Sequence, residues 1–510
     1  MLINLILVLF FIASLIFRLF YVSNFNFAFT IDQARDMLMI RQIAVGHDPV
    51  FIGPVTSLNG VYLGPFWFYF NLLPFLFGGG DPTHLVYWLI IFFHFSVLIF
   101  FLYFRKKNYA FAFWGSLFLL VSPRFFELTS YSLNANATPI FVVLFLIALD
   151  YTLRSTKTRP MFFLGLLAGI GLQIEAAFGI LLLPLALLWS LFKRKKGYFK
   201  FLLGFLLTLT PQLLFEIKHR FQMTRTFISV FTGQSTILGD RLDLSAKFSD
   251  RWEQYFKMLL SSLPAGIAPW LFLLSLICLL LLATRHRKRL QSAPAFGLCF
   301  SLITLSVIFY LAYPYGLKGW WMTNLTGPYL LIMASSLALL GQTKKFIARL
   351  LSVIFLIYLI FVSFRFYQDR LHQKLTTRTA DRALLLNQLD AIDWTYHEAS
   401  GSGFRTYVFT PAVYDLNYQY LYWWYGLGKY GYLPDKVTYQ DDVPEYIENK
   451  AAYWTNPRPF SGLTFLLLET YPQFVDREAD WRQRYLKLCK TKDVRLTGAI
   501  VVEKVTTCKK

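Results

Sequence analysis

The chain has 510 residues, of which 56% are hydrophobic and 19% are aromatic, and its mean hydropathy is +0.46. These values exclude an ordinary soluble globular protein, and the apolar residues form blocks long enough to cross a membrane. The formal net charge of +21 is spread over short clusters between these blocks and is not gathered on one folded domain. Such a distribution is typical of a multispan membrane protein and argues against nucleic acid as a partner.

The opening apolar run has no basic region before it and no clear small-residue cleavage site, so we interpret it as a first span that is retained. Hydropathy and the basic clusters predict about eleven spans and an inside N-terminus. The predicted spans are residues 2–22, 84–104, 109–122, 139–153, 160–173, 177–192, 201–215, 264–284, 295–312, 328–342 and 346–364.

Five basic clusters set the predicted orientation, because cytoplasmic loops are enriched in lysine and arginine. All five face inside if the apolar run from Tyr62 to Phe77, which is short and contains two prolines, lies in the outer leaflet without crossing. The outer loops are then residues 23–83, 123–138, 216–263 and 313–327. The five clusters are Arg105–Lys107, Arg154–Arg159, Lys193–Lys200, Arg285–Arg289 and Lys344–Arg349.

From about Arg365 the composition becomes that of a soluble protein. We expect a transmembrane domain at residues 1–364 and an extracytoplasmic domain of the α/β or α+β class at residues 365–510. In the second domain a helix is predicted from Thr376 to about His397, and the predicted strands are residues 406–410, 462–468 and 498–505.

Four cysteines form no metal-ligand spacing. Cys278 and Cys299 lie in predicted spans and are expected to be packing residues. Cys489 and Cys508 lie in the C-terminal domain, and their positions are compatible both with a disulfide and with two free thiols.

A short helix is predicted directly after the first span. Thr30 and Gln33 have the form of a capping box, which would start the helix at Ile31, and Gly46 is suited to end it. The helix would therefore lie in the first outer loop, where the chain leaves the membrane.

Three charged residues share one face of this predicted helix. Asp32, Arg35 and Asp36 are spaced i, i+3 and i+4. Charged groups held at a membrane boundary cost stability, so they are candidates for a functional site.

An acidic outer loop above a bundle of spans suits the transfer of a sugar from a lipid-phosphate donor. A polyprenyl phosphate is a good leaving group, so one base that deprotonates the acceptor hydroxyl suffices, together with cations that stabilise the departing phosphate. Asp32 is the candidate base. The candidate phosphate ligands are Arg35, Lys218, His219 and Arg220.

The order of elements at the start of the chain resembles that of the C-type (GT-C) glycosyltransferases. A first span is followed by an outer loop with an early aspartate in a short helix, then by a turn rich in glycine and proline, and then by an aromatic half-buried helix. Within these glycosyltransferases the chain is similar to the branch of protein O-mannosyltransferases and aminoarabinose transferases. The similarity covers roughly residues 1–220 and is carried by DQARD, GPVTSLNGVYLGPFWFYF, SPRFFELTSYSLNANATP and GLQIEAAFG. The resemblance implies a GT-C fold, a polyprenyl-phosphate sugar as donor, and Asp32 at the position of the catalytic base.

The chain departs from that branch at several positions. Gln33 stands where the branch usually has glutamate, Asn134 and Asn136 stand where many members place a second acid, and Glu175 replaces a histidine expected near Gln173. Because two neutral amides replace the anionic ligand that a divalent cation prefers, we expect no metal cofactor. The residues expected to bind substrate are Arg35, Asp36, Asn134, Asn136, Gln173, Glu175, Lys218, His219 and Arg220.

These candidates also have structural interpretations. Asp32 suits a helix start, where an acid faces the positive end of the macrodipole, and Arg35 with Asp36 suits an ordinary pair on a helix face. The two asparagines suit loop turns, and the basic cluster after residue 217 suits a solvated surface. The resemblance favours catalysis for Asp32.

The leading hypothesis is an inverting glycosyltransferase that moves a sugar from a polyprenyl phosphate to a glycan, lipid or protein acceptor, at the outer face of the plasma (inner) membrane. One alternative is a transporter of lipid-linked sugar, against which the spans carry few midplane charges and no matching broken helices. Another is a catalytically silent relative that binds lipid-linked sugar, which is favoured by the missing second acid where Asn134 and Asn136 stand. The expected partners are the donor, membrane lipids and the acceptor, without nucleic acid.

Overall fold

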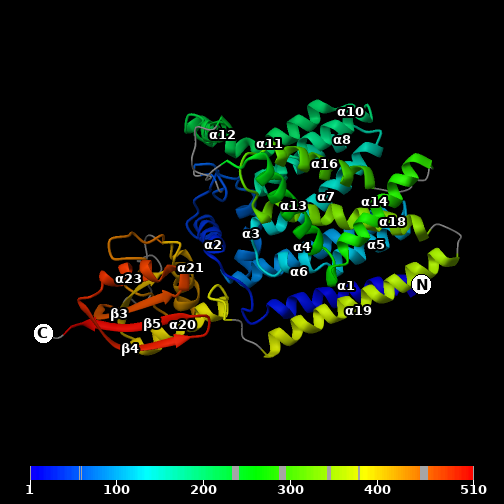
Figure 1. Cartoon of the computed structure of the whole chain (residues 1–510). Coiled ribbons are helices and arrows are strands. Elements are labelled where there is room, and N and C mark those ends of the chain that lie inside the picture. Colours follow the sequence, from blue (N-terminus) through cyan, green and yellow to red (C-terminus); the bar gives the residue numbers. More distant parts are fainter. Residues whose placement is uncertain are drawn as a thin grey trace. The chain divides into compact units, whose positions relative to one another are not determined.

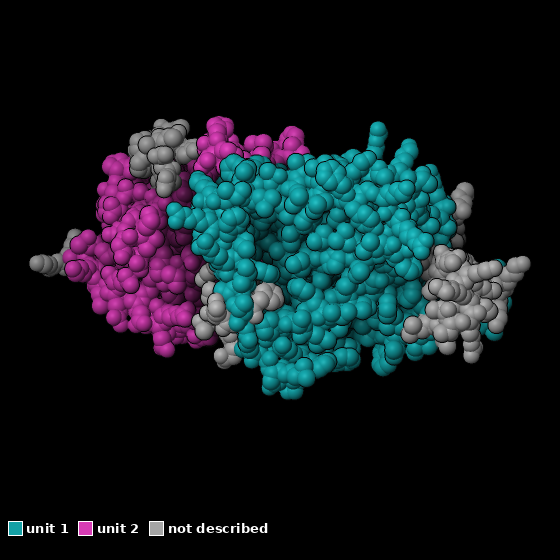
Figure 2. Space-filling model, turned by 90° about the horizontal axis from the view of Figure 1, so that it is seen from above, with its two compact units in different colours: residues 1–20, 50–70, 87–369 teal, residues 21–49, 71–86, 370–510 magenta. Residues whose placement is uncertain are grey.

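The structure is a computed structural model of the chain and describes residues 2–56, 58, 60–232, 241–285, 295–341, 346–376, 380–447 and 458–508. Contacts divide the chain into two compact units, which Figure 2 colours separately. Unit 1 consists of residues 1–20, 50–70 and 87–369, and unit 2 of residues 21–49, 71–86 and 370–510. The boundary predicted at residue 364 stays a prediction, but unit 2 contains two N-terminal segments that the sequence does not group with the C-terminal residues. Each unit is described by itself.

Apolar helices build most of unit 1 (Figure 1). Among the described residues, six helical segments are long and apolar enough to cross a membrane, and shorter apolar helices occur between them in the chain. The predicted fold class, an α-helical polytopic membrane protein with a small C-terminal domain, is confirmed, and each predicted span coincides with one or two of these helices. The long segments are α1 (Leu2–Val22), α4 (Pro82–Phe104), α7 (Asn134–Arg154), α11 (Tyr198–Lys218), α17, η2 and α18 together (Gly319–Leu340), and α19 (Phe346–Thr376).

The remaining helices of the N-terminal three quarters of the chain are shorter or more polar. The shorter apolar helices are α3 (Phe66–Phe77), α5 (Tyr109–Val121), α8 (Arg159–Ile174), α9 with α10 (Ala176–Phe192), α14 (Ala268–Arg285) and α16 (Phe296–Ala312). The others are α2 (Ile31–Ala44), α6 (Pro123–Leu128), α12 (Gln222–Thr232), α13 (Leu244–Leu260) and the 3₁₀ turn η1 (Pro264–Gly266).

The apolar run from Tyr62 to Phe77 forms only one short helix. Helix α3 has 12 residues and contains Pro74. At 1.5 Å per residue it is about 18 Å long, against a hydrocarbon layer of about 30 Å. This length agrees with the prediction that the run does not cross the membrane.

One end of unit 1 gathers three of the predicted cytoplasmic clusters. Lys107 and Arg154 both pair with the carboxylate of Asp150, at 2.6 and 3.0 Å. The Lys200 ammonium donates to the Thr158 hydroxyl at 2.7 Å. The clusters at 105–107, 154–159 and 193–200 therefore lie at the same end of the bundle, as the prediction of a shared side requires. Part of each of the other two clusters lies outside the described residues.

A buried arginine ties the first span to its neighbours. Arg18 is 1% exposed, and its guanidinium donates to the carbonyls of Phe125 and Leu120 at 2.7 and 3.2 Å and to the Thr129 hydroxyl at 2.5 Å. Leu120 lies in the last turn of α5, where carbonyls lack a partner within the helix. Because an unpaired carbonyl is costly in an apolar interior, Arg18 stabilises the junction between α5 and α6.

The C-terminal part of unit 2 is a five-stranded sheet in the order β2-β1-β3-β5-β4. Strand β1 is parallel to β2 and β3, whereas β5 is antiparallel to β3 and β4. The mixed sheet confirms the predicted small α/β or α+β domain. The strands are β1 (Gly403–Phe409), β2 (Lys436–Thr438), β3 (Phe460–Glu469), β4 (Leu488–Leu496) and β5 (Ile500–Thr507).

Two predictions for this domain need correction. The helix predicted from Thr376 to His397 is α20, which spans Leu385–Ala399, because α19 itself continues to Thr376. The polar end of α19 has neither glycine nor proline to stop it, so the helix runs past the apolar segment. Strands β2 and β4 were not predicted.

Helices and a disulfide complete the domain. A cluster of buried residues that includes Phe409, Leu468 and Trp481 forms a core between the sheet and α23 (Val475–Gln483). Cys489 and Cys508 form a disulfide, which decides between the two alternatives that the sequence left open. The connections are α21 (Leu416–Leu421), the π-helical turn η3 (Tyr422–Gly426), α22 (Leu427–Tyr430) and η5 (Pro472–Phe474).

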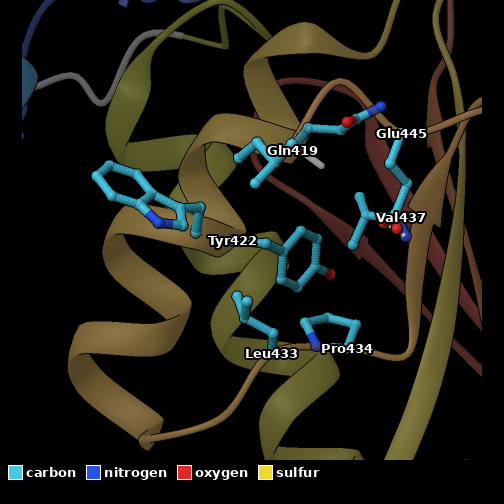
Figure 3. Close-up of a pocket in the computed structure, with 8 residues that line it drawn as sticks. Gln419, Tyr422, Leu433, Pro434, Val437 and Glu445 are labelled. Carbon is cyan, nitrogen blue, oxygen red and sulfur yellow. Dashed lines mark hydrogen bonds between the residues drawn. The ribbon is translucent and has the colours of Figure 1, made fainter. Parts of the chain in front are cut away.

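Figure 3 shows a small pocket between η3 and β2 that is internal packing. Its volume of about 10 Å³ holds at most one water molecule. The polar groups at its edge are already engaged, since Glu445 accepts from the Val437 N–H and Gln419 accepts from the Tyr446 N–H, both at 2.7 Å.

Reporter fusions would test the predicted topology. A reporter fused after residue 83 or 370 should be exposed outside, and one fused at residue 106, 195 or 287 should be inside, because the basic clusters are retained in the cytoplasm. Accessibility to a membrane-impermeant label in intact cells measures the side. An external reporter at residue 106 would show that α3 crosses the membrane and would invert every later loop.

Candidate active site

Helix α2 begins where its capping sequence predicts. The Thr30 N–H donates to Oε1 of Gln33 at 2.9 Å, and the reciprocal bond of the capping box is present as well. The helix runs from Ile31 to Ala44, close to the predicted stop at Gly46. This short-range chemistry places Asp32 in the first turn of α2, inside unit 2.

Asp32, Arg35 and Asp36 form one ion-pair cluster. Arg35 donates to Oδ1 of Asp32 at 2.9 Å through Nη1 and to Oδ1 of Asp36 at 3.0 and 2.8 Å through Nε and Nη2. The Asp36 side chain is 4% exposed and that of Asp32 is 61% exposed. Burial lowers the pKa of Arg35, but the two carboxylates outweigh burial and raise it overall, so the guanidinium stays charged.

Asp32 is therefore the accessible carboxylate of the cluster. Asp36 holds Arg35 from the buried side, and Arg35 holds only one oxygen of Asp32. The second oxygen of Asp32 has no hydrogen-bond partner among the described residues and is open to a ligand.

In unit 1, Gln173 joins the first outer loop to the bundle. Its Oε1 accepts from the Phe66 N–H at 3.1 Å, and its Nε2 donates to the carbonyl of Thr208 in α11. Gly64 lies directly against the Gln173 side chain, where a Cβ would clash with it. The sequence GPFW is thus fitted to Gln173, at the end of α8.

The two asparagines start α7. Nδ2 of Asn134 donates to the carbonyl of Ile174 at 2.7 Å, and Nδ2 of Asn136 donates to the carbonyl of Tyr131 at 3.0 Å. The second predicted outer loop is thereby joined to the residues that follow Gln173. These amides serve as donors to backbone, and no group of three His, Cys, Asp or Glu that could hold a metal ion occurs among the described residues. The absence of a metal cofactor stays a prediction, and no step is assigned to a divalent cation.

Glu175 lies between α8 and α9. It is 7% exposed, and its carboxylate accepts only a long bond from the Ala177 N–H, at 3.4 Å. Burial raises the pKa of this carboxyl to about 7, because the charged form loses its hydration. The Tyr310 hydroxyl donates to the Ala177 carbonyl at 2.9 Å, so the polar region extends to α16.

The basic cluster Lys218–Arg220 occupies an exposed turn between α11 and α12. His219 stacks on Phe215, with 3.9 Å between ring centroids. The turn is held by Glu216, which is 6% exposed and accepts from the N–H groups of Met223 and Thr224, both at 2.9 Å. This arrangement matches a solvated or headgroup-contacting cluster, and the predicted role in substrate binding stays a prediction.

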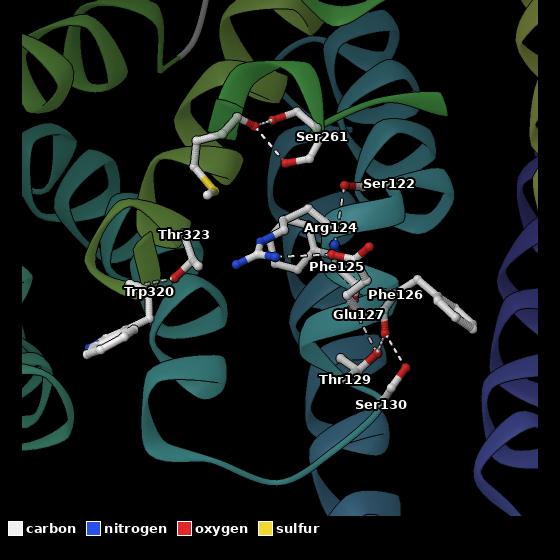
Figure 4. Close-up of polar contacts among 12 residues, drawn as sticks. Ser122, Arg124, Phe125, Phe126, Glu127, Thr129, Ser130, Ser261, Trp320 and Thr323 are labelled. Carbon is white, nitrogen blue, oxygen red and sulfur yellow. Dashed lines mark hydrogen bonds and ion pairs between the residues drawn. The ribbon is translucent and has the colours of Figure 1, made fainter. Parts of the chain in front are cut away.

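Sequence reasoning missed Arg124, in α6 of the second outer loop. Ser122 caps this helix, and Arg124 pairs with Glu127 at 3.1 Å. In Figure 4 the Arg124 side chain extends from α6 toward the side on which Trp320 and Thr323 are drawn. Its Nε is buried without a hydrogen-bond partner among the described residues. The signal available in the sequence was a charged residue beside the Ser-Pro helix start in a loop that otherwise has few charges.

Buried polar atoms without partners occur in the same outer segments of unit 1. Among the described residues they are the Ser132 hydroxyl, the side-chain amide oxygen of Asn324 and the Thr326 hydroxyl. All three side chains are at most 6% exposed. Such atoms are costly unless a ligand or water satisfies them. They make the outer segments of unit 1 a candidate substrate surface.

The structure brings the predicted residues together in two groups. Asn134, Gln173 and Glu175 lie on joined segments of unit 1, and Asp32, Arg35 and Asp36 form the cluster in unit 2. The convergence of the two groups on one cavity stays a prediction.

The helical bundle with a small C-terminal α/β domain has a fold similar to that of ArnT, a GT-C aminoarabinose transferase. The comparison that shows this is with two crystal structures of ArnT from Cupriavidus metallidurans, one bound to undecaprenyl phosphate and one in the apo state. Each matches with a TM-score of 0.56 and 12% sequence identity over 98% of this chain and 97% of that chain. No family model and no curated protein sequence matches the chain. The predicted resemblance is confirmed as one of fold.

Replacing Glu175 by glutamine should remove a pH dependence of stability. The carboxyl has a pKa near 7 in the folded chain and near 4.5 when unfolded. Between these values the unfolded chain releases the proton first, so the wild type loses stability as pH rises through this window, by up to about 3 kcal/mol. Glutamine mimics the neutral acid, so Glu175→Gln should melt like the wild type at pH 4.5 and at a higher temperature at pH 8.

Thermal melting of the purified protein in detergent at the two pH values measures this effect. The exposed Glu253→Gln is the matched control and should follow the wild type. An unchanged pH dependence in Glu175→Gln would contradict the assignment.

Proposed function

We propose that this chain is an inverting glycosyltransferase that uses a polyprenyl-phosphate sugar, with Asp32 as the catalytic base. The observation that carries the proposal is the Asp32–Arg35–Asp36 cluster in a chain with the GT-C fold. In this cluster Asp32 is accessible and has one oxygen without a partner among the described residues. Arg35 holds Asp32, and the buried Asp36 fixes Arg35. The undecaprenyl phosphate bound to ArnT supports the choice of lipid class.

The proposed reaction is a single displacement. Asp32 takes the proton from an acceptor hydroxyl, the acceptor oxygen attacks the anomeric carbon, and the bond from that carbon to the phosphate oxygen breaks. The polyprenyl phosphate leaves with the bonding electrons. Attack from the face opposite the leaving phosphate inverts the anomeric configuration, because no enzyme nucleophile intervenes.

Arg35 acts in this scheme as a positioning residue. Nε, Nη1 and Nη2 of Arg35 each donate a hydrogen bond to Asp32 or Asp36, so the guanidinium is held between the two carboxylates. By its hydrogen bond to Oδ1 it restricts the Asp32 carboxylate to one orientation.

The departing phosphate needs a cation elsewhere. We assign this role to Arg124, whose Nε is buried without a described partner, with the exposed cluster Lys218–Arg220 as a second contact for the lipid phosphate. A guanidinium in a partly buried site stabilises developing negative charge more strongly than an exposed one. The neutral Asn134 and Asn136 in place of a second acid remain the one feature that favours the silent relative.

Asp32→Asn should lower glycosyl transfer by at least about 10²-fold, because the amide keeps the shape but cannot accept the proton. Asp36→Asn should cost less, since it loosens Arg35 without removing the base. Asp48→Asn, in the exposed loop after α2, is the matched control. Transfer from radiolabelled polyprenyl-phosphate sugar in membrane extracts is the measurement, with melting temperature as the check on folding.

Full transfer by Asp32→Asn would remove the proposed mechanism. Movement of the lipid-linked sugar across vesicles without transfer would identify a transporter, and donor binding with neither activity would identify a silent relative.

Transfer should survive removal of divalent cations. The amides of Asn134 and Asn136 donate to carbonyls and replace the anionic ligand that a hard cation prefers. The measurement is the rate of transfer after treatment with EDTA, compared with untreated protein. A loss that Mg²⁺ or Mn²⁺ restores would keep the enzyme but overturn the metal-free scheme.

A further inference from the structure

The C-terminal domain has an open pocket that the proposed chemistry does not use. It is lined by Ala380, Asp381, Arg382, Tyr471 and Gln473, and its volume is about 520 Å³. Its two sides come from the segment before α20 and from the turn after β3. The carboxyl ends of the parallel strands β1 and β3 lie at the same edge of the sheet, and ligands of α/β sheets commonly bind at such an edge.

An arginine and an aromatic ring form the centre of this pocket. The guanidinium carbon of Arg382 lies 3.5 Å from the centroid of the Tyr471 ring. Nη1 of Arg382 is buried without a hydrogen-bond partner, and no ion pair joins Arg382 to a carboxylate among the described residues. Stacking fixes the plane of the guanidinium but leaves a buried donor unsatisfied, which costs free energy unless a ligand supplies an acceptor.

A buried acid stands behind the pocket. Glu469, the last residue of β3, is 5% exposed and accepts hydrogen bonds from the Tyr418 hydroxyl at 3.1 Å and from Nδ2 of Asn417 at 3.5 Å. Burial raises the pKa of this carboxyl to about 7, and the nearby charge of Arg382 works in the opposite direction without pairing with it. The region behind the pocket therefore carries both a donor and an acceptor.

The pocket segment is joined to the residues that lead into α2. The Phe29 N–H donates to the Ala383 carbonyl at 2.7 Å, and Ala28 forms an antiparallel bridge with Leu384. Ala383 follows Arg382, and Phe29 lies three residues before Asp32. The wall of the pocket and the candidate base are thus on backbone segments that hydrogen-bond to each other within unit 2.

The charges around the pocket select the class of ligand. The lining carries one acid, Asp381, and one cation, Arg382, so the two charges offset each other and favour neither an anion nor a cation. A neutral ligand with many hydroxyls can use donors and acceptors together: Oδ1 of Asp381 accepts from the Ala383 N–H at 2.9 Å, which leaves its other oxygen as an acceptor, and Arg382 and Gln473 supply donors. Planar polar side chains beside an aromatic ring suit vicinal hydroxyls and an apolar sugar face.

We propose that this pocket binds a neutral saccharide, which is the acceptor of the glycosyl transfer. The role of the saccharide as acceptor rests on the proposed function. The binding of a saccharide in this pocket does not. This inference selects a glycan from the three acceptor classes, glycan, lipid and protein.

Binding would be measured on the full-length protein in nanodiscs, by titration calorimetry with tetrasaccharides of mannose, glucose and galactose. The wild type should bind at least one of them saturably. Arg382→Gln and Tyr471→Leu, which change opposite walls, should each weaken that binding at least tenfold. Arg477→Gln and Tyr414→Leu change exposed residues of the same domain and should bind like the wild type, and melting temperatures check that every variant folds.

Absence of binding by all three tetrasaccharides, or wild-type affinity in both pocket variants, would overturn the proposal. Preferential binding of glucuronic acid or inorganic phosphate would overturn the neutral class of ligand.

Hydrolysis of the donor by water separates this inference from the proposed function. It should be lost in Asp32→Asn but unchanged in Arg382→Gln and Tyr471→Leu, whose KM for the acceptor should rise. Saccharide binding without any Asp32-dependent turnover would contradict the proposed glycosyltransferase activity but support the saccharide site. Asp32-dependent turnover without saccharide binding would support the activity and contradict the saccharide site.

Discussion

The outer loops of unit 1 depend on the side-chain amide of Gln173. A loop that folds back onto an apolar bundle brings its backbone polar groups out of water, and each must find a partner. Gln173 accepts from the Phe66 N–H and donates to the Thr208 carbonyl, so one side chain satisfies the first loop and α11 together. Gly64 is required beside it, because any side chain there would displace the amide. The Asn134 bond to Ile174 extends the same principle to the second loop.

Unit 2 meets a different requirement, which is to hold an accessible carboxylate in one orientation. Two acids share one arginine, and their environments differ: Asp36 is buried against Arg35, and Asp32 is mostly exposed. The buried acid fixes the cation, and the cation fixes the exposed acid with one of its oxygens free. The cost of burying charge is thus confined to the pair of Arg35 and Asp36, and the Asp32 carboxylate remains exposed to water.

The sequence predicted those features that depend on neighbouring residues. The start of α2 follows from Thr30 and Gln33, and the apolar helices follow from hydropathy. Strand β4 was missed because its side chains are mostly polar and exposed, and β2 because it has three residues. Arg124 resembled any charged loop residue, since its buried Nε is visible only in three dimensions. The grouping of residues 21–49 with the C-terminal domain depends on hydrogen bonds such as that from the Phe29 N–H to Ala383, which no local pattern encodes.

The same hydrogen bonds join two segments that are synthesised at different times. Nε2 of Gln388 in α20 donates to the carbonyl of Phe29, which lies 359 residues earlier in the chain. At the usual rate of translation, on the order of tens of seconds pass between synthesis of the two partners. During that time the segment leading into α2 has already left the first span while its partner strand does not yet exist. The hydrogen bonds of the segment that leads into α2 therefore form only after residue 388 has been synthesised, and a chain that stops within α19 would insert into the membrane without them.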